Sequence, residues 1–428
     1  MKTFEELALT PEIAAALAKG GFAVPTPIQA QAIPLALKGH DIMGLAQTGT
    51  GKTLAFGLPM LDAVLRKPGK PAPKTCKALI LAPTRELVNQ TAHTLKSLTR
   101  ETKIRVTTIV GGASIAKQRQ LLDRGTDIIV ATPGRLIDLL DRGSLDLSKT
   151  THLVLDEADQ MLDIGFIHAL RKIVPFLYDD RQTLLFSATM SKQMEELSRA
   201  YLTNPKKVQL NPASRAAEKI DQSVRSVEKP KKPSVLREIL GQHPNTATLV
   251  FARTKHGAER LKKGLVADGF AATSVHGNKS QGQRDHAIKQ FRAGAMQILV
   301  ATDVAARGID IPAVGLVVNY DLPNQPENYV HRIGRTARAG RSGVAVTLCA
   351  PDEVKLLRAI EKLIKAGIQV DGDMPDDMPG PLQDTQRLKA SKPKRRQRRR
   401  KTGSHQPGSA PNSNKTRGRR PKPQKHAA

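Results

Sequence analysis

The sequence predicts an α/β protein with two tandem, doubly wound parallel sheets and a basic C-terminal tail that does not fold by itself. Three observations support this prediction. Short apolar runs alternate with helix-length segments through most of the chain, as expected for a parallel sheet with crossover helices. The chain has 428 residues, which is more than one hydrophobic core usually serves. The alternation stops after about residue 371, where the composition changes.

The first domain is predicted to span residues 1–210. Its expected strands are short apolar runs that end in turn residues, and helical patterns separate them. They are DIMGLA (41–46), ALILAP (78–83), VTTIVG (106–111), DIIVAT (127–132), HLVLDEA (152–158), TLLFSA (183–188) and KVQL (207–210). This order predicts one parallel, doubly wound sheet.

The second domain is predicted to span residues 220–371, after a polar linker at 211–219 that has no clear apolar period. Its expected strands are again separated by helix-length segments. They are DQSVRSV (221–227), TLVFAR (248–253), ATSVHG (272–277), QILVAT (297–302), GLVVNYD (315–321) and GVAVTLC (343–349). Two α/β domains in tandem are expected to form a cleft between them.

The tail, residues 372–428, begins with a stretch rich in Pro, Gly and Asp and continues as a basic run that cannot bury enough apolar surface to fold. From Arg387 to Ala428 there are 16 Lys and Arg and no Asp or Glu, which leaves about +13 of the net charge of +29 for the rest. Such a charge favours a polyanionic partner, with nucleic acid first. The alternative is a tail that only improves solubility.

Targeting and redox signals favour a cytoplasmic protein. The chain has two cysteines, Cys76 and Cys349, whose spacing suggests neither a metal site nor a disulfide framework. Glutamates interrupt the N-terminal segment where a signal peptide would be apolar, and no run of about 18 apolar residues occurs. We therefore expect no membrane association.

The segment AQTGTGKT, Ala46–Thr53, follows the strand DIMGLA and precedes a helix-like segment. Backbone N–H groups of a glycine-rich loop at a helix N-terminus bind phosphates, a lysine reaches the β and γ phosphates, and a hydroxyl ligates Mg²⁺. Lys52 and Thr53 fit the last two roles. The loop itself is Thr48, Gly49, Thr50 and Gly51. The alternative is a glycine-rich turn before a core helix.

The segment LVLDEAD, 153–159, places carboxylates at the end of an apolar strand. A second Mg²⁺ ligand belongs at such a position in a phosphate-binding sheet. Asp156 is expected to hold the ion and Glu157 to orient or deprotonate the attacking water. The alternative is a helix N-terminus capped by acidic residues.

Together these segments resemble the DEAD-box family of ATP-dependent RNA helicases. The resemblance extends from Phe4 to about Gly343, and Ala46 in the phosphate loop is ordinary for that family. The remaining motifs stand in the family's order: PTPIQ (25–29), PTREL (83–87), GG (111–112), TPGR (132–135), SAT (187–189), ATDVAARGID (301–310) and HRIGRTAR (331–338). The resemblance implies two RecA-like domains, ATP and Mg²⁺ as cofactors, RNA as the partner and ATP hydrolysis as the reaction.

The resemblance also implies which residues contact the base and the ribose of the nucleotide. Gln29 is expected to recognise the adenine edge, since a side-chain amide offers both a donor and an acceptor. Phe4 is expected to stack on the base, and Asp310 to contact the ribose. Taken alone, Gln29 is a surface glutamine and Phe4 an anchor for the first helix.

A set of strand-end and turn residues corresponds to positions that contact the RNA backbone in the family. They are Pro83, Thr84, Arg85, Gly112, Thr132, Pro133 and Arg135 in the first domain, and Arg253, Gly277 and Thr302 in the second. Glycines and hydroxyls at strand ends allow a ribose–phosphate chain to approach backbone N–H groups. The alternative for most is a turn or cap role. His276 and Asp303 are expected near this contact, although His276 can equally be a strand-end histidine satisfied by backbone.

The coupling residues implied by the resemblance are Asp159, Ser187, Thr189, His331 and Arg332. Ser187 and Thr189 are expected to hydrogen-bond toward Asp159 and the second domain. His331 and Arg332 are expected to join the same interdomain network.

The run HRIGRTARAGR, 331–341, has an arginine at every third position from Arg332, which suits either a nucleic-acid backbone or a nucleotide. The resemblance implies that Arg335 and Arg338 cross the cleft to the γ-phosphate, while Arg341 caps a short helix. Ala337 stands where many family members have glycine. Because its methyl group is small, we expect a negative φ there.

These observations predict an ATP-dependent RNA helicase of bacterial type that acts as a monomer. The RTAR variant and the basic tail favour the RhlE-like subgroup. Local, non-processive duplex unwinding or remodelling of ribonucleoprotein is the expected activity. A DNA translocase on the same fold is an alternative that would lack PTPIQ and DEAD. An ATP-timed RNA chaperone, annealing factor or assembly clamp acting through the tail is another. Ribosomal particles or RNA-degradation proteins are the expected further partners.

Overall fold

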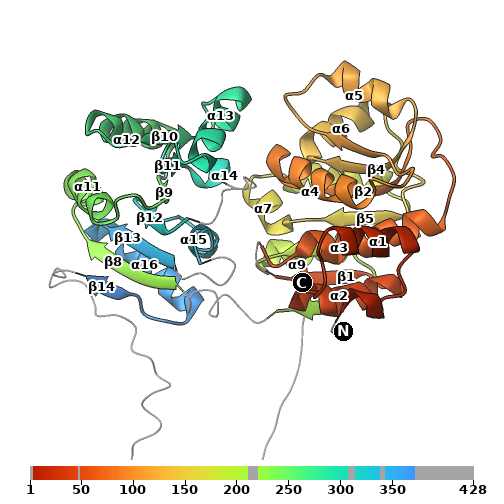
Figure 1. Cartoon of the computed structure of the whole chain (residues 1–428), viewed down its shortest axis with the longest axis horizontal. Coiled ribbons are helices and arrows are strands. Elements are labelled where there is room, and N and C mark those ends of the chain that lie inside the picture. The colour runs from red at the N-terminus through yellow and green to blue at the C-terminus, as the bar shows by residue number, and fades with distance from the viewer. Residues whose placement is uncertain (1–2, 47–48, 211–219, 307–313, 338–342, 372–428) are drawn as a thin grey trace, which may run out of the picture. The chain divides into compact units, whose positions relative to one another are not determined.

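The computed structural model describes residues 3–46, 49–210, 220–306, 314–337 and 343–371 (Figure 1). Two parallel sheets of seven strands each are present in these ranges. The predicted linker, 211–219, and the predicted tail, 372–428, lie outside the described residues. So do four residues discussed above, Thr48, Asp310, Arg338 and Arg341.

The first sheet has the strand order β3-β4-β2-β5-β6-β1-β7, and every neighbouring pair is parallel. Its strands are β1 (Ile42–Leu45), β2 (Cys76–Leu81), β3 (Val106–Ile109), β4 (Thr126–Ala131), β5 (His152–Leu155), β6 (Gln182–Ser187) and β7 (Lys206–Gln209). The helices that belong with it are η1 (Phe4–Glu6), α1 (Pro11–Lys19), α2 (Pro27–Leu37), α3 (Lys52–Arg66), α4 (Arg85–Leu98), α5 (Ile115–Leu122), α6 (Pro133–Asp141), α7 (Ala158–Asp163), α8 (Ile167–Ile173), η2 (Val174–Phe176) and α9 (Lys192–Tyr201).

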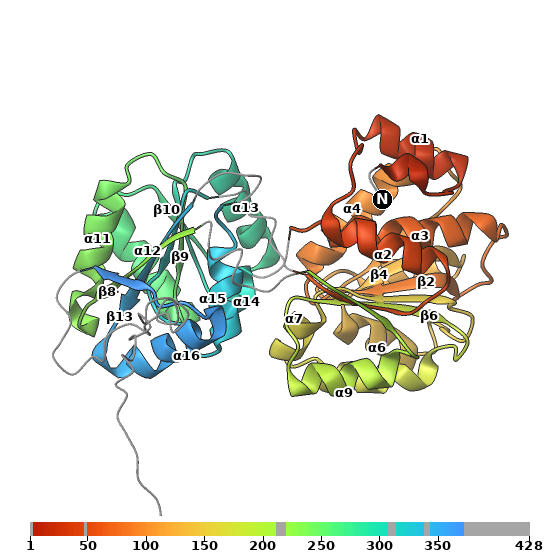
Figure 2. The ribbon, with the colours of Figure 1, turned by 90° about the horizontal axis from the view of Figure 1, so that it is seen from below.

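Helices cover both faces of this sheet, with α1 to α4 on one face and α6, α7 and α9 on the other (Figure 2). Strand β2 shows why both faces are apolar. Ala78 and Ile80 belong to the core under α1 to α4, whereas Leu79 and Leu81 belong to the core under α6 to α9. Alternate side chains of a strand point to opposite faces, so a strand buried on both sides is an unbroken apolar run. That is the pattern from which the sequence predicted these strands.

The second sheet has the order β10-β11-β9-β12-β13-β8-β14 and is also parallel. Its strands are β8 (Ile220–Ser226), β9 (Thr248–Phe251), β10 (Ala272–Val275), β11 (Ile298–Ala301), β12 (Leu316–Asn319), β13 (Gly343–Cys349) and β14 (Gln369–Asp371). Its helices are η3 (Lys229–Lys231), α11 (Lys232–Gln242), α12 (Lys255–Ala267), α13 (Gln281–Arg292), α14 (Asp303–Ala306), α15 (Pro326–Ile333), η4 (Pro351–Glu353) and α16 (Val354–Ile364).

The tandem α/β fold class predicted from the sequence is confirmed, and each predicted apolar run contains a strand. Strand β14 was not predicted. It has three residues, none of them buried, and it pairs only with β8 at the sheet edge. Such a strand has too few apolar positions to show a period. The exact domain boundaries stay a prediction.

Among the described residues, none of the helices is both long enough and apolar enough to cross a lipid bilayer.

Candidate nucleotide and nucleic-acid site

The phosphate loop connects the end of β1 with the first residue of α3. Gly49 and Gly51 have φ of +83° and +91°, a region that glycine adopts without strain. A Cβ atom on Gly51 would also collide with the side chains of Gln29 and Thr26. The loop therefore needs glycine at position 51 for two reasons. The loop leaves the first backbone N–H groups of α3 available at the N-terminus of this helix, where anions bind.

Lys52 is the first residue of α3 and is 6% exposed. Its ammonium group donates to the carbonyl oxygen of Ala46 over 3.2 Å and lies 3.5 Å from Oε1 of Glu157. Burial alone would lower the pKa of Lys52, but the carboxylates of Glu157, Asp156 and Asp159 raise it above its usual value. The lysine is therefore charged and held over the loop.

Asp156 and Glu157 follow β5 directly, and both are 3% exposed. Glu157 has φ +52°, a left-handed conformation that is costly for a side-chain-bearing residue. Its carboxylate contacts Lys52 and the side-chain amide of Gln160. Asp156 is different, because its Oδ1 is buried and accepts no hydrogen bond from the described residues. Burial raises the pKa of Asp156 to about 7, although Lys52 opposes the shift.

These residues fit a magnesium nucleotide. Within the described ranges no cluster of three His, Cys, Asp or Glu side chains could hold a metal ion without help. Magnesium commonly uses only one or two carboxylates together with substrate phosphates and water. Asp156 offers such a donor, a buried carboxylate oxygen without a partner among the described residues. Thr53 offers a hydroxyl group at the N-terminus of α3.

Gln29 connects helix α2 with the phosphate loop. It is 3% exposed, its Oε1 accepts the N–H of Thr26 over 2.9 Å, and its Nε2 donates to the carbonyl of Gly51 over 2.9 Å. A side-chain amide has a second lone pair and a second N–H, so adenine recognition remains possible chemically. Phe4 is 6% exposed and packs in the first-domain core, which matches the anchor alternative. Its stacking on a base stays a prediction.

Asp159 holds the segment after β6. Its Oδ2 accepts the N–H groups of Ala188 and Thr189 over 3.1 and 3.0 Å and the Thr189 hydroxyl over 3.1 Å. The Ser187 hydroxyl donates to the Thr189 carbonyl over 2.7 Å. The structure thus brings Asp159, Ser187 and Thr189 together inside the first domain. Asp159 lies two residues from Glu157, so this cluster is adjacent to the phosphate site.

The predicted RNA residues of the first domain lie at the carboxyl ends of neighbouring strands. The order β3-β4-β2 places the segments after Ile109, Ala131 and Leu81 in register. Pro83 and Gly112 stand in the segments that follow β2 and β3, whereas Thr132 and Pro133 lead directly from β4 into α6. A single edge of the sheet therefore carries all of them.

Two arginines also reach that edge. The Arg135 guanidinium donates to the carbonyl of Ala113 over 2.9 Å. Gly112 has φ +70°, and a Cβ there would lie 2.5 Å from Nη1 of Arg85, so glycine makes room for that side chain. Thr84 caps α4 by accepting the N–H of Leu87, whereas Thr132 makes no side-chain cap. Thr132 nevertheless stands at the N-cap position of α6 with Pro133 at the first helical position, so the cap alternative describes both threonines, with a side-chain hydrogen bond only at Thr84.

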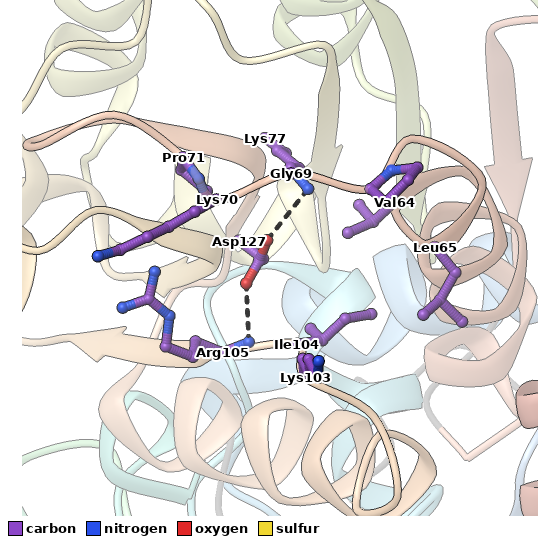
Figure 3. A pocket seen from close by; sticks show the side chains of 11 residues that line it. Val64, Leu65, Gly69, Lys70, Pro71, Lys77, Lys103, Ile104, Arg105 and Asp127 are labelled. Atoms are coloured by element: carbon purple, nitrogen blue, oxygen red, sulfur yellow. Dashed lines mark hydrogen bonds and ion pairs between the residues drawn. The ribbon is translucent and has the colours of Figure 1, made fainter.

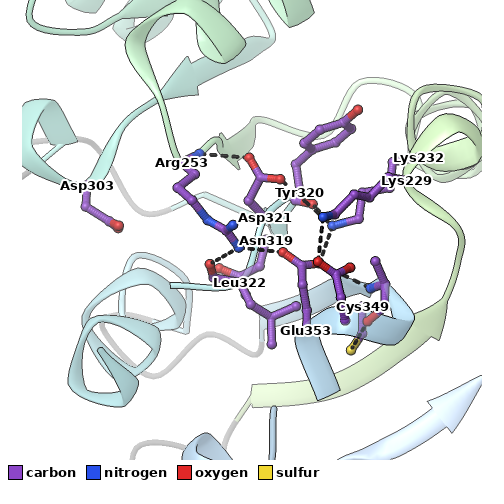
Figure 4. A network of polar contacts seen from close by, with 12 residues as sticks. Lys229, Lys232, Arg253, Asp303, Asn319, Tyr320, Asp321, Leu322, Cys349 and Glu353 are labelled. Atoms are coloured by element: carbon purple, nitrogen blue, oxygen red, sulfur yellow. Dashed lines mark hydrogen bonds and ion pairs between the residues drawn. The ribbon is translucent and has the colours of Figure 1, made fainter. Parts of the chain in front are cut away.

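In the second domain, the exposed Arg253 belongs to a polar network in which Lys232 and Glu353 are buried (Figure 4). Its backbone N–H donates to Asp321 over 2.8 Å, and its guanidinium donates to Oε1 of Glu353 over 2.5 Å. Glu353 is 2% exposed and also accepts from Lys232 over 2.6 Å. Lys232 donates in turn to the carbonyl of Tyr320 over 2.8 Å. The predicted contact of Arg253 with RNA would therefore compete with an internal ion pair.

Gly277 and Thr302 follow the neighbouring strands β10 and β11, at one edge of the second sheet. His276 is 4% exposed, and its Nε2 lies 3.0 Å from Oε2 of Glu259. The backbone alternative for this histidine is therefore wrong, since a carboxylate satisfies it. Its Nδ1 has no partner among the described residues.

Arg332 is buried in a polar network of the second domain. It is 2% exposed and binds Asp303 through two hydrogen bonds of 2.6 and 2.8 Å, with further donations to Asn319 and to the carbonyl of Asp321. The guanidinium also lies over the Phe251 ring at 5.0 Å. These partners all belong to the second domain, and a role of Arg332 in a network with Asp159 stays a prediction. Arginine has five N–H donors, and burial requires local acceptors for them.

His331 and Arg335 line one small cavity of the second domain, which Asp303 and Asn328 also border. Both ring nitrogens of His331 are buried without a hydrogen-bond partner in the described part of the chain. Arg335 is 6% exposed. Arg338 lies outside the described residues, so the pair of predicted finger residues is seen only in part.

Ala337 has φ +53°, so the expectation of a negative φ is wrong. The small methyl group does not decide the backbone here. Thr336 and Ala337 pack directly against Gly343, where even a Cβ would collide with both residues. Tertiary packing therefore holds an alanine in a conformation that usually requires glycine.

The sequence did not predict the second-domain pair Lys232 and Glu353. Both stand in ordinary helical segments outside every recognised motif, and only their burial distinguishes them. A lone lysine or glutamate in a sequence is normally a surface residue. No local signal identifies such a pair, because its members are 121 residues apart.

Comparison with known proteins agrees with this geometry. A DEAD/DEAH box helicase model matches residues 26–197, and a helicase conserved C-terminal domain model matches residues 231–340. DEAD-box ATP-dependent RNA helicase 30 of Arabidopsis thaliana is 44% identical over 86% of this chain and 63% of its own length. DEAD-box ATP-dependent RNA helicase CshA of Geobacillus kaustophilus is 42% identical over 85% of this chain and 77% of its own.

A solved structure of S. cerevisiae Dbp5 bound to RNA and ADP BeF3 is 35% identical, with a TM-score of 0.77. The match covers 87% of this chain and 96% of that one. Tandem parallel sheets with a phosphate loop after β1 and paired acids after β5 define a two-domain, RecA-like nucleotide-binding protein. The chain belongs to the DEAD/DEAH box helicase family and is an enzyme of that class. Its RhlE-like assignment stays a prediction.

Proposed function

We propose that this protein is an ATP-dependent RNA helicase that hydrolyses ATP to ADP and phosphate when RNA is bound and separates short duplexes locally. The observation that carries the proposal is the cluster of Lys52, Asp156 and Glu157 at the ends of β1 and β5. It combines the charged Lys52 over a phosphate loop with the Glu157 carboxylate beside that lysine and the Asp156 carboxylate, whose Oδ1 has no hydrogen-bond partner among the described residues. Phosphoryl transfer depends on positioning and electrostatics, which such a cluster supplies.

Each residue of the cluster has a distinct role in this proposal. Lys52 binds the β and γ phosphates, and these contacts replace its ion pair with Glu157. Asp156 and Thr53 hold Mg²⁺, which neutralises phosphate charge when it is bound. Glu157, released from Lys52, orients the attacking water and accepts its proton. Gln29 contacts adenine with the donor and acceptor that the protein leaves unused.

The second domain contributes cations and the ribose contact. Arg335 and Arg338 stabilise the charge that develops on the γ-phosphate, and Asp310 binds the ribose. A finger arginine is worth about 10³ to 10⁵ in rate, so hydrolysis depends on both domains. Asp159, Ser187, Thr189 and His331 transmit the state of the nucleotide.

RNA binding and ATP binding support each other if both favour the same closed form, because linkage is reciprocal. The proposed contacts are to phosphate and sugar, through the strand-end residues of both domains and Arg253. Binding with little sequence preference follows. The basic tail adds affinity that decreases with salt. A cytoplasmic location, a monomeric state and ribosomal or RNA-degradation partners remain part of the proposal.

An ATPase assay tests the proposal. Single-stranded RNA and DNA of equal length are compared, and we expect RNA to stimulate hydrolysis and DNA to have little effect. Glu157→Gln should bind ATP and RNA but turn over slowly, whereas the exposed control Glu195→Gln should behave as the wild type. Stimulation by DNA alone would contradict the proposal and favour a DNA translocase.

A second function is favoured by one sequence feature, the 16 cations without a counter-charge in residues 387–428. They suit an RNA chaperone or clamp in which ATP only times release. Strand annealing that persists in Glu157→Gln without ATP, and disappears when residues 387–428 are removed, would support it. Annealing that survives the truncation would argue against it.

A further inference from the structure

The first domain has a cavity of about 350 Å³ that the phosphate site does not use (Figure 3). Its walls come from the end of α3, the segment between α3 and β2, and the starts of β2, β3 and β4. Val64, Leu65 and Ile104 line it together with Pro68 and Pro71. The walls are therefore largely apolar.

The rim of this cavity is basic. Asp127 contributes a carboxylate, but that group already forms an ion pair with Lys77 Nζ at 3.2 Å and accepts the N–H of Arg105 over 3.0 Å. Lys70 and Lys103 are exposed and make no ion pair with any described residue. Their charges are left without compensation.

A second hollow of about 320 Å³ continues the first and shares Val64, Pro68, Lys70 and Lys77 with it. It adds two more exposed lysines, Lys67 and Lys149. The two hollows together form what we call the basic groove. It has an apolar floor and several uncompensated cations, with Asp127 as its one carboxylate in the described residues.

The basic groove lies at the amino ends of the strands, whereas the phosphate loop and the proposed RNA residues follow their carboxyl ends. Lys77 and Asp127 stand at the starts of β2 and β4, and Pro83 and Thr132 follow the other ends. A six-residue strand is about 20 Å long, so a ligand in the groove would not occupy the nucleotide site. The groove is a separate surface of the same domain.

We propose that the basic groove binds an acidic peptide segment of a partner protein, with one apolar side chain in the cavity and carboxylates on Lys70 and Lys103. An apolar cavity favours an apolar side chain, because burial removes both surfaces from water. A nucleic-acid strand fits less well. No Phe, Tyr or Trp lines the cavity to stack on a base, and a ribose–phosphate chain has nothing to fill the apolar floor.

Fluorescence anisotropy on the full chain tests this proposal. The probes are labelled acidic peptides that each carry one Leu, Met or Phe, and they include the acidic stretch 371–384 of this chain, DGDMPDDMPGPLQD. We expect binding that weakens with salt and weakens about tenfold in Lys70→Glu/Lys103→Glu. Replacing the apolar residue of the peptide with Ser should weaken binding as well. RNA-stimulated ATP hydrolysis of the double variant, which lacks no proposed catalytic group, should match the wild type.

The matched control is Lys206→Glu/Lys207→Glu, two exposed lysines on β7 at the far edge of the same sheet. It should bind the peptides as the wild type does. The proposal is overturned if no peptide of the panel binds, or if both double variants weaken binding equally. It is also overturned if Lys70→Glu/Lys103→Glu lowers RNA affinity and no peptide competes with RNA, since the groove would then be an RNA surface. Failure here leaves the ATPase proposal intact.

Discussion

Breaking the buried pair between Lys232 and Glu353 should destabilise the second domain strongly, whereas removing both charges should cost less than either single change. Both side chains are 3% exposed or less, and their atoms are 2.6 Å apart. Removal of one partner from a buried ion pair typically costs about 3 to 5 kcal/mol, because the other charge remains without compensation. Replacement of both charges by apolar groups of similar volume is often nearly neutral.

The remaining contacts rank the variants. Lys232→Met leaves Glu353 with Arg253 at 2.5 Å and the Ala350 N–H at 3.1 Å, so we expect about 3 kcal/mol. Glu353→Leu leaves the ammonium group of Lys232 with the Tyr320 carbonyl at 2.8 Å and the more distant Asp321 carboxylate at 3.9 Å, so we expect about 4 kcal/mol. The double variant should lose about 2 kcal/mol, mostly from the Ala350 N–H and Arg253.

Hydrogen exchange measured by mass spectrometry on the whole chain reports the free energy of opening for β13 and α11. The control is Lys231→Met, which removes an exposed ion pair of 3.0 Å to Glu228 and should cost less than about 1 kcal/mol. Additive single effects, or a Lys232→Met variant within about 1 kcal/mol of the wild type, would refute the reasoning. Glu353→Leu should also change the RNA concentration for half-maximal ATPase stimulation if Arg253 contacts RNA.

Three further predictions concern the nucleotide site. Asp156→Asn should abolish RNA-stimulated ATP hydrolysis yet raise the melting temperature of the nucleotide-free protein by a few degrees, because the buried side chain is then uncharged. Asp180→Asn, at an exposed position, is the control. A lower melting temperature for Asp156→Asn would contradict this prediction. Thr189→Val removes the 3.1 Å hydroxyl bond to Asp159 and should lower duplex unwinding more than ATP hydrolysis, so an equal loss of both in parallel assays would argue against a coupling role. Arg338→Ala should lower turnover by about 10³ with little change in ATP affinity, and weaker RNA binding with normal turnover would disprove its assignment as a finger residue.

The sequence predicted the fold well because the evidence for it is local. Each strand of a doubly covered parallel sheet is apolar on both faces, as Ala78 to Leu81 are, and therefore stands out as a short unbroken run. Strand β14 escaped prediction because it is short and exposed. The phosphate loop was predictable for the same reason as the strands, since glycines with positive φ must stand beside Lys52 in the chain.

The environment of single site residues was less predictable, because burial and long-range partners decide it. Arg332 has the motif position of a coupling residue, but the nearest acceptors for a buried guanidinium are those of Asp303, Asn319 and Asp321. Phe4 likewise stands at the expected distance from its motif but packs in a core. A motif specifies which residues occur together in the sequence. It does not specify which of these residues make their contacts within the protein and which make them with a ligand.

Three unfavourable features of this structure lie within the motifs that are proposed to bind nucleotide. Glu157 and Ala337 both have positive φ, and Asp156 has a buried oxygen without a partner. A conformation of this kind costs about 1 to 3 kcal/mol and persists only where the surroundings enforce it. Strand β5 and the Asp159 contacts enforce it for the acidic pair, and the close approach of Gly343 enforces it for Ala337. Neither conformation adds stability to the ligand-free fold. We infer that the Asp156 oxygen is left without a partner for the bound state, in which Mg²⁺ would supply the contact that the protein lacks, so nucleotide should stabilise this chain more than its contact area alone would suggest.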